Sequence, residues 1–216
     1  DWDIAYRSDP KFASLEGQSR QWAAMVTRID AHIGNILAAL DDPNGDGDQG
    51  DSIAEDTVVV FQSDNGGPRG SCLRELNSNG GLRGTKGSIY EGGIRVPLIL
   101  RWPSKINERS MLRAGSACEQ VVDVTDLLPT FCDLAGAEIP LGVDGVSIAP
   151  RLLGETPQKQ RAFIIHEANN QASIIRGNQK LIRGTRGKFE LYDLLRDPAE
   201  SNDLSDLQPK LVSELR

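Results

Sequence analysis

The chain has 216 residues, of which 38% are hydrophobic and 25% are charged, and its net charge is −7. This composition is typical of a globular protein that is long enough to bury a core. The negative charge disfavours nucleic acid as a partner, because neutralising a phosphate backbone requires a basic face. No stretch is long and apolar enough to span a membrane. The three cysteines Cys72, Cys118 and Cys132 lack zinc-site spacing, and the sequence leaves open whether two of them form a disulfide.

The first expected element is a long amphipathic helix over residues 11–40, where apolar residues recur at helical spacing. We expect its apolar face to lie against a core and His32 to be a polar surface residue. The acidic segment 41–51 follows and imitates the start of an EF-hand loop, but Ile53 occupies the position of the bidentate glutamate. We therefore interpret this segment as a solvated acidic turn, with a weak accessory calcium site as the alternative.

Two short strands and a helix are predicted next. Residues 57–61 form a continuous apolar run rich in β-branched side chains, which predicts a buried strand that runs parallel to its neighbours. A second strand is expected over residues 96–101. Helical spacing returns over residues 121–135, with Gly136 as the C-terminal stop. This alternation of strands and helices predicts an α/β architecture.

The pattern changes after about residue 154 to short strands separated by turns. Gly177 and Asn178 have the composition of a tight hairpin turn, and a terminal helix is expected over residues 208–216. The strands are expected at residues 161–166, 172–176, 180–183 and 189–194. We therefore predict two units, an α/β part over residues 1–153 and a small antiparallel sheet with a helix over residues 154–216.

Asp64 and Asn65 are the first candidate site residues, because they lie at the C-terminal end of the strand predicted at residues 57–61, after Gln62 and Ser63. Ligands of open α/β sheets gather beyond the carboxyl ends of the strands. A carboxylate and a carboxamide provide hard oxygen donors, which suit Ca²⁺ or Mg²⁺ better than a soft metal. The alternative is an Asx turn that leads into Gly66 and Gly67.

The segment 66–95 is the second candidate feature. It contains nine glycines, and its five cationic side chains outnumber its two carboxylates to give a local net charge of +3. Glycines allow the backbone to approach a ligand closely, and the cations attract an anion. Lys86 lies in Arg83-Gly-Thr-Lys-Gly87, which is not a Walker motif. A mobile surface loop is the alternative for this segment alone, but next to Asp64 and Asn65 it suggests a metal together with an oxyanion.

Several motifs together resemble the sulfatase family, the formylglycine-dependent members of the alkaline-phosphatase-like superfamily. Residues 57–66 look like the metal-binding strand of that family, and residues 82–97 are similar to its second signature. Three later stretches fit the C-terminal half of the family in the right order, namely residues 123–135, 144–147 and 190–198. The resemblance implies part of an alkaline-phosphatase-like mixed sheet flanked by helices, followed by a small C-terminal antiparallel sheet with a helix.

The resemblance also implies roles for the candidate residues. Asp64 and Asn65 would bind a calcium ion, with magnesium a less favoured alternative, and Lys86 would contact the sulfate group. The nucleophile of the family is a hydrated formylglycine made within a Cys/Ser-x-Pro-x-Arg motif, which this sequence lacks. The other metal carboxylates, lysine and histidines of the family precede the matched region. We therefore expect this chain to be the C-terminal portion of a longer sulfatase, with the formylglycine upstream of Asp1.

The resemblance leads to expectations about substrate, location and association. The expected substrate is a sulfated small molecule or carbohydrate, and the expected location is the periplasm or the outside of the cell. A sheet that lacks its early strands would expose apolar edges, so we expect self-association or pairing with an N-terminal portion. Two alternatives remain, a phosphate or phosphonate ester hydrolase of the same superfamily and a non-catalytic binding module.

Overall fold

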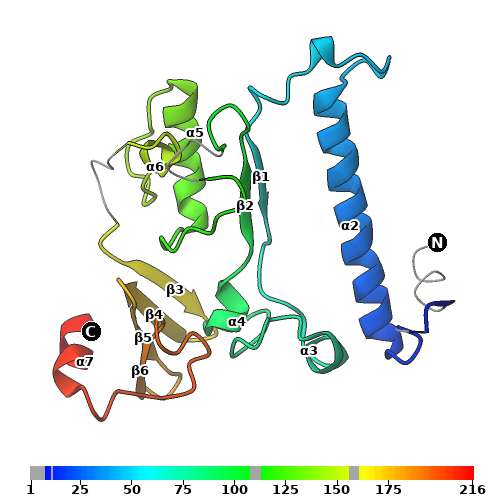
Figure 1. Cartoon of the computed structure of the whole chain (residues 1–216). Helices are drawn as coiled ribbons and strands as arrows, with labels where there is room; N and C mark the ends of the chain where they lie inside the picture. Colours follow the sequence, from blue (N-terminus) through cyan, green and yellow to red (C-terminus); the bar gives the residue numbers. More distant parts are fainter. Residues whose placement is uncertain (1–7, 11, 108–112, 156–160) are drawn as a thin grey trace.

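The computed structural model describes residues 8–10, 12–107, 113–155 and 161–216. Two sheets organise these residues (Figure 1), a two-stranded sheet of β1 and β2 and a four-stranded sheet in the order β3-β4-β5-β6. Helices flank the first sheet, and a terminal helix lies beside the second. The predicted α/β architecture with a separate antiparallel sheet is therefore confirmed.

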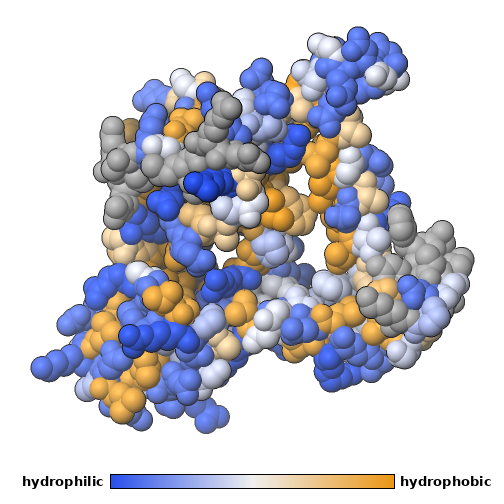
Figure 2. All heavy atoms as spheres, viewed as in Figure 1, coloured by the Kyte–Doolittle hydropathy of each residue, from blue (hydrophilic) through white to orange (hydrophobic). Residues whose placement is uncertain are grey.

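Helix α2 (Gly17–Asp41) stands apart from the sheet of β1 and β2 (Figure 1). It begins later than the predicted helix, whose expected first residue Lys11 lies outside the described residues. Met25, Ile29 and Ile36 retain 62%, 49% and 57% of their accessible surface, so the expected packing of this face on a core is not found among the described residues. Figure 2 shows hydrophobic residues of the helix facing a hollow in the molecule. Its main contact with another element is with α3 (Ser71–Leu76).

Strands β1 (Val59–Gln62) and β2 (Leu98–Arg101) correct one prediction. They pair antiparallel, with Val59 opposite Arg101 and Gln62 opposite Leu98, and β1 is half-buried. The prediction of a buried strand with parallel neighbours is therefore wrong within the described part of the chain. A continuous apolar run indicates a strand but does not determine its direction, which here is fixed by the return of the chain through residues 63–97.

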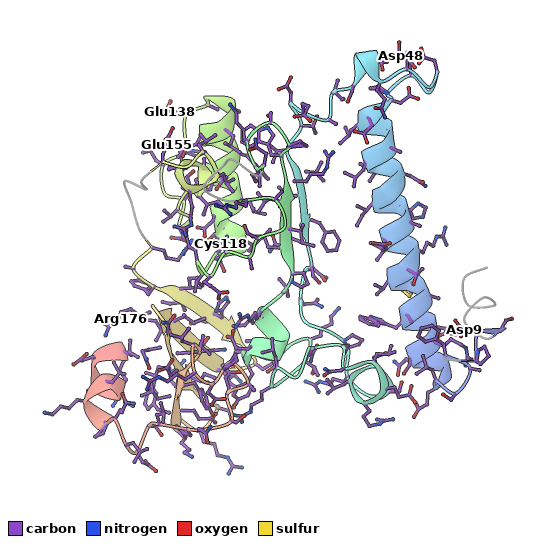
Figure 3. All side chains as sticks on the ribbon, viewed as in Figure 1. Asp9, Asp48, Cys118, Glu138, Glu155 and Arg176 are labelled. Atoms are coloured by element: carbon purple, nitrogen blue, oxygen red, sulfur yellow. The ribbon has the colours of Figure 1, made fainter. Side chains whose placement is uncertain are left out.

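The acidic segment after α2 is an exposed turn, as interpreted from the sequence. The carboxylate of Asp42 accepts hydrogen bonds from the amides of Gly45 and Gly47 at 2.8 and 2.9 Å, and a 3-10 turn follows at Gln49–Asp51. Asp48 in this segment lies at the end of α2 that is far from α4 (Figure 3). The turn is therefore remote from the candidate site residues.

The region after β2 contains a shorter helix than predicted. A 3-10 turn (Val124–Asp126), capped by Asp123, leads into α5 (Leu127–Ala135). Gly136 has a φ of 65°, so it ends α5 in the left-handed conformation that glycine favours, as predicted. Helix α6 (Ala149–Leu152) packs beside α5.

The C-terminal sheet confirms all four strands predicted after residue 154. The hairpin turn at Gly177–Asn178 is also confirmed, because Arg176 pairs with Gln179 across it. The elements are β3 (Ile164–Ala168), β4 (Gln171–Arg176), β5 (Gln179–Arg183), β6 (Phe189–Asp193) and α7 (Pro209–Leu215).

The two faces of the C-terminal sheet have different partners. One face buries Leu181 and Leu191 against Leu215 of α7. The other face packs Ile182 and Tyr192 against Ile89, which lies 1% exposed in the glycine-rich segment. The C-terminal sheet is thus the support on which the segment around Lys86 rests.

The cysteines and the helices complete the description of the fold. Cys72, Cys118 and Cys132 are all free thiols, and only Cys72 is buried. Among the helices in the described ranges, none has both the length and the apolar character that crossing a membrane requires.

Candidate functional site

Asp64 and Asn65 lie just beyond the end of β1, separated from its last residue Gln62 by Ser63. The hydroxyl of Ser63 donates to the carbonyl of Asn65 at 2.9 Å, and the Asn65 amide nitrogen donates to the carbonyl of Gly66 at 2.9 Å. These bonds leave the Asn65 side-chain oxygen available. The exposed carboxylate of Asp64 has no hydrogen bond or ion pair within the described residues. The side-chain oxygens of Asp64 and Asn65, which the sequence predicts as ligands of a hard cation, therefore accept no hydrogen bond from the described residues.

The Asx-turn alternative for Asp64 is not supported by the hydrogen bonds. In an Asx turn the Asp64 carboxylate would accept a backbone amide from the residues that follow. The amide of Gly66 instead donates to the carbonyl of Gly93 at 2.9 Å. The segment after β1 is therefore held by α4 (Glu91–Ile94) and not by the Asp64 side chain.

Lys86 is joined to this segment through the backbone. Its amide donates to the carbonyl of Gly67 at 3.0 Å, two residues after Asn65. The tip of the β3–β4 hairpin adds a second contact, because the Asn169 amide nitrogen donates to the carbonyl of Gly87 at 2.9 Å. The structure therefore brings the backbone around Asp64 and Asn65 beside the backbone around Lys86.

Lys86 differs from the other cationic residues of the segment 66–95. Arg69 donates to the Thr85 hydroxyl at 3.0 Å, and the other three arginines each lie near a carboxylate. The exposed ammonium of Lys86 has no such partner in the described parts of the chain. Of the five cations that the sequence singled out, Lys86 is thus the one whose side chain has no protein partner within the described residues.

The close packing around α4 requires glycine both within the helix, at Gly92, and in the segment that contacts it, at Gly66. A Cβ on Gly66 would overlap the carbonyl oxygen of Gly92, and a Cβ on Gly92 would lie 2.5 to 2.8 Å from three carbonyl oxygens of residues 82–84. The amide of Gly92 donates to the carbonyl of Arg83 at 2.6 Å. Gly66 and Gly92 therefore allow close backbone packing.

A large open cavity of about 1420 Å³ adjoins the candidate site. Asp64 and Arg95 line it on one side, and the loop of residues 113–123, marked by Cys118 in Figure 3, lines it on another. Asn65 and Lys86 do not line it. The cavity thus contains one of the three predicted residues, and it does not by itself define a pocket for an anion.

The sequence analysis missed the contacts that anchor Arg83. The guanidinium lies 3.9 Å from the centroid of the Tyr90 ring and donates to the Tyr192 hydroxyl at 2.7 Å. Burial acts to lower the pKa of Arg83, but the nearby Tyr192, Tyr90 and Glu190 outweigh it and raise that pKa. Arg83 is therefore a permanent cation that ties the segment before Lys86 to β6.

A buried charge cluster was also missed. Lys180 on β5 is fully buried, and its ammonium lies 2.8 Å from a carboxylate oxygen of Glu91 and 2.8 Å from one of Glu200. Burial raises the pKa of Glu200, and Lys180 opposes that effect. Lys180 and Glu200 lie far from Glu91 in the sequence, so no local motif joins the three residues.

No group of three or more His, Cys, Asp or Glu side chains that could hold a metal occurs among the described residues. Asp64 and Asn65 nevertheless fit a hard cation chemically, because their oxygens are uncommitted. Calcium takes six to eight oxygen ligands, so these two residues would make up only part of a coordination shell.

Comparisons with known proteins identify related families. A family model described as Sulfatase matches residues 7–137, and one described as N-sulphoglucosamine sulphohydrolase, C-terminal, matches residues 85–214. A protein named Sulfatase from Formosa agariphila is 39% identical over 85% of this chain and 35% of its own length. Arylsulfatase A from Homo sapiens is 30% identical over 96% of this chain and 39% of its own length. The chain thus spans little more than a third of these relatives.

Solved structures agree with these relatives. A protein solved in complex with its substrate D-glucosamine-2-N,6-O-disulfate is 27% identical and covers 91% of this chain and 38% of its own, with a TM-score of 0.69. The phosphonate monoester hydrolase of Agrobacterium radiobacter covers 90% of this chain and 39% of its own, with a TM-score of 0.66. At 21% identity, this second likeness shows the fold alone.

Proposed function

This chain belongs to the sulfatase family, and on that premise we propose that it carries part of the active site of a sulfuric ester hydrolase. Asp64 and Asn65 are the proposed ligands of a calcium ion, with magnesium the less favoured cation. Lys86 is the proposed catalytic residue that grips an oxygen of the sulfate group. The reaction is the hydrolysis of a sulfate ester, in which the bond between sulfur and the leaving oxygen breaks.

One observation carries this proposal. The hydrogen bond from the Lys86 amide to the Gly67 carbonyl, at 3.0 Å, joins the two halves of the site. The Asp64 carboxylate and the Lys86 ammonium are both exposed, and neither has a partner in the described ranges. A divalent cation would offset the charge of the sulfate, and Lys86 would stabilise the negative charge that develops on its oxygens as the ester breaks.

The remainder of the active site is proposed to come from residues outside this chain. A formylglycine would supply the nucleophile, and further carboxylates would complete the calcium shell. Within the chain, we propose that residues 1–153 belong to the catalytic α/β domain and residues 154–216 form a C-terminal subdomain. The separate four-stranded sheet of β3 to β6 supports this division.

The proposed substrate is a sulfated small molecule or carbohydrate. The solved relative that binds D-glucosamine-2-N,6-O-disulfate as its substrate supports this class. A periplasmic or secreted location is proposed with it. A phosphate or phosphonate ester hydrolase, and a non-catalytic binding module, are the alternatives. Inhibition by sulfate, compared with inhibition by phosphate, separates the two enzymatic alternatives, and calcium binding with no enzyme activity would indicate the binding module.

Calorimetric titration of the chain with calcium and then sulfate tests the two roles. Asp64→Ala should abolish calcium binding, whereas Asp46→Ala in the remote acidic turn is the matched control and should leave it. Lys86→Ala should weaken sulfate binding but spare the cation, and Lys188→Ala, on a side chain that is 77% exposed, is its control. Unchanged calcium binding by Asp64→Ala would count against the proposed site.

Turnover tests the proposal that the site is incomplete. The intact mass of the chain is measured first, and hydrolysis of an aryl sulfate is then assayed with the chain alone. We expect no turnover by the chain alone and measurable turnover by an enzyme that also contains a Cys/Ser-x-Pro-x-Arg motif upstream. Turnover by the isolated chain would overturn the proposal that residues outside it complete the site.

A further inference from the structure

We propose that the buried cluster of Lys180, Glu91 and Glu200 is a positioning device that sets the distance between the cation ligands and Lys86. This inference rests on the proposed function, because it concerns the geometry of that same site. The cluster lies under α4, on the side of the C-terminal sheet, and none of its three side chains belongs to the candidate site itself.

The cluster is closed by three short contacts. The Lys180 ammonium donates to Glu91 at 2.8 Å and lies 2.8 Å from Glu200. The other carboxylate oxygen of Glu200 accepts the backbone amide of Glu91 at 2.6 Å. Glu200 has a φ of 55°, a left-handed conformation that is unusual for this residue type. Its surroundings therefore hold Glu200 in a conformation that it would not prefer alone.

The charges of the cluster are balanced through a fourth residue. One ammonium faces two carboxylates, and Arg95 lies 3.9 Å from the second oxygen of Glu91. Arg95 also lines the cavity beside Asp64, so Glu91 links the buried cation to the cavity wall. Buried ion pairs contribute little net stability compared with apolar packing. We therefore assign this cluster to holding α4 in position and not to stabilising the fold.

Helix α4 transmits the position of the cluster to both halves of the site. Glu91 is its first residue, and the next two residues make the transmitting contacts. The amide of Gly92 donates to the carbonyl of Arg83 at 2.6 Å, three residues before Lys86. The carbonyl of Gly93 accepts the amide of Gly66 at 2.9 Å, directly after Asn65. A shift of α4 would therefore move the segment after β1, which carries Asp64 and Asn65, or the segment that carries Lys86, and so change the distance between them.

Helix α4 needs this external support because it has only four residues. A helix of one turn is not stable by itself, and its first amides have no partners within the helix. Glu200 accepts one of those amides, and Lys180 fixes the side chain of the same residue, Glu91. The position of α4 therefore depends on two residues of the C-terminal sheet region.

The test compares Glu200→Gln with the wild-type chain in two measurements. Amide hydrogen exchange should become about tenfold faster at Gly66, Lys86 and Gly92, because their acceptors are no longer held in place. The affinity for sulfate, titrated by calorimetry, should fall about fivefold, as expected when a binding group is misplaced. Glu200→Asp keeps the charge but is shorter, and it should show the same two effects more weakly.

Asp203→Asn is the matched control on the same loop. The Asp203 carboxylate accepts the amide of Leu191 at 3.1 Å, so this substitution also removes the charge from a loop contact, but not from one with α4. This control should lower the thermal midpoint without changing exchange at residues 83–94 or sulfate affinity. Equal acceleration of exchange at residues 83–94 in both variants would overturn the positioning role.

A double variant separates positioning from folding. If Glu200 acts on the anion through Lys86, adding Glu200→Gln to Lys86→Ala should cause no further loss of sulfate affinity. A fully additive loss would overturn the inference. If the wild-type chain fails to bind sulfate, the proposed function fails, and the exchange comparison still decides whether the cluster positions α4.

Discussion

The amide of Gly66 donates to the carbonyl of Gly93 at 2.9 Å, and this pair joins the end of β1 to α4. The two backbones approach so closely that a Cβ on Gly66 would overlap the Gly92 carbonyl oxygen. The proposed cation ligands Asp64 and Asn65 are therefore placed by a contact that only glycine permits at this position.

Gly66→Ala should separate the end of β1 from α4. We expect a loss of about 1–3 kcal/mol in the free energy of unfolding, as for overpacked interiors, together with weaker calcium binding. Urea denaturation and calorimetry measure the two effects. Gly34→Ala in α2, where an added Cβ meets nothing within 4 Å, is the control and should stabilise the helix by about 0.5–1 kcal/mol. A Gly66→Ala chain as stable as the wild type would contradict the close approach.

Arg83→Lys should show how much the planar guanidinium contributes to anchoring the segment before Lys86. Lysine retains the charge but loses the stacking on Tyr90 and the geometry of the bond to Tyr192, so we expect a loss of about 1–2 kcal/mol. Arg74→Lys, at an ion pair with Glu16 whose Arg74 side chain is 63% exposed, should change stability by less than about 0.5 kcal/mol. Equal effects of the two substitutions in urea denaturation would contradict this prediction.

Stability should depend on pH through His166. Burial lowers the pKa of His166 despite the nearby carboxylates of Asp123 and Glu91, and Lys180 acts in the same direction as burial. The unfolded chain therefore binds more protons than the folded chain as the pH falls through the unfolded-state pKa of about 6.5. We expect stability to decrease as the pH falls from about 7.5 to about 5.5, and His166→Gln to flatten this dependence.

The contribution of Glu200 has to be separated from that of His166, because it changes the free energy of unfolding with pH in the opposite direction. Burial raises its pKa, so its folded form binds the extra proton, and the stability that this proton provides is lost as the pH rises through the folded-state pKa. The measurement is therefore the difference between wild type and His166→Gln in urea titrations across the pH range. His32→Gln on the exposed side of α2 is the control, and an unchanged slope in His166→Gln would refute the prediction.

The exposed apolar face of α2 should make the chain associate. Ile29 and Ile36 are about half exposed on a face that soluble proteins normally cover. Ile29→Lys combined with Ile36→Lys should lower the weight-average mass measured by sedimentation. Arg28→Lys combined with His32→Lys is the control on polar positions of the same helix. A wild-type chain that remains monomeric at high concentration would contradict this prediction.

The local elements of the fold could be predicted because short-range chemistry determines them. The Gly177–Asn178 turn and the cap at Gly136 both depend on backbone conformations that few residue types adopt. The direction of β1 could not be predicted in the same way, since it depends on where a chain of more than thirty residues returns. Helical periodicity likewise identified the apolar face of α2 but not what lies against it.

The candidate site was only partly accessible from the sequence. Asp64 and Asn65 were singled out from their types and their place after a strand, and Lys86 from the resemblance to sulfatases, and all three roles remain predictions. Lys180 and Glu200 could not be found, because a lysine within a strand and a glutamate within a turn are typical of solvated positions. Their significance depends on contacts with Glu91, which is 109 residues from Glu200.

That separation has a consequence for the order of events during synthesis. Glu200, whose carboxylate accepts the hydrogen bond from the Glu91 amide, is translated 109 residues after Glu91. The glycine-rich segment therefore leaves the ribosome long before Lys180 and Glu200, which hold α4, have been synthesised. Contacts between residues so far apart in the sequence also form slowly. The segment can reach its native arrangement only after residue 200 has emerged, so a nascent chain stopped before that point would expose this region to proteases and chaperones.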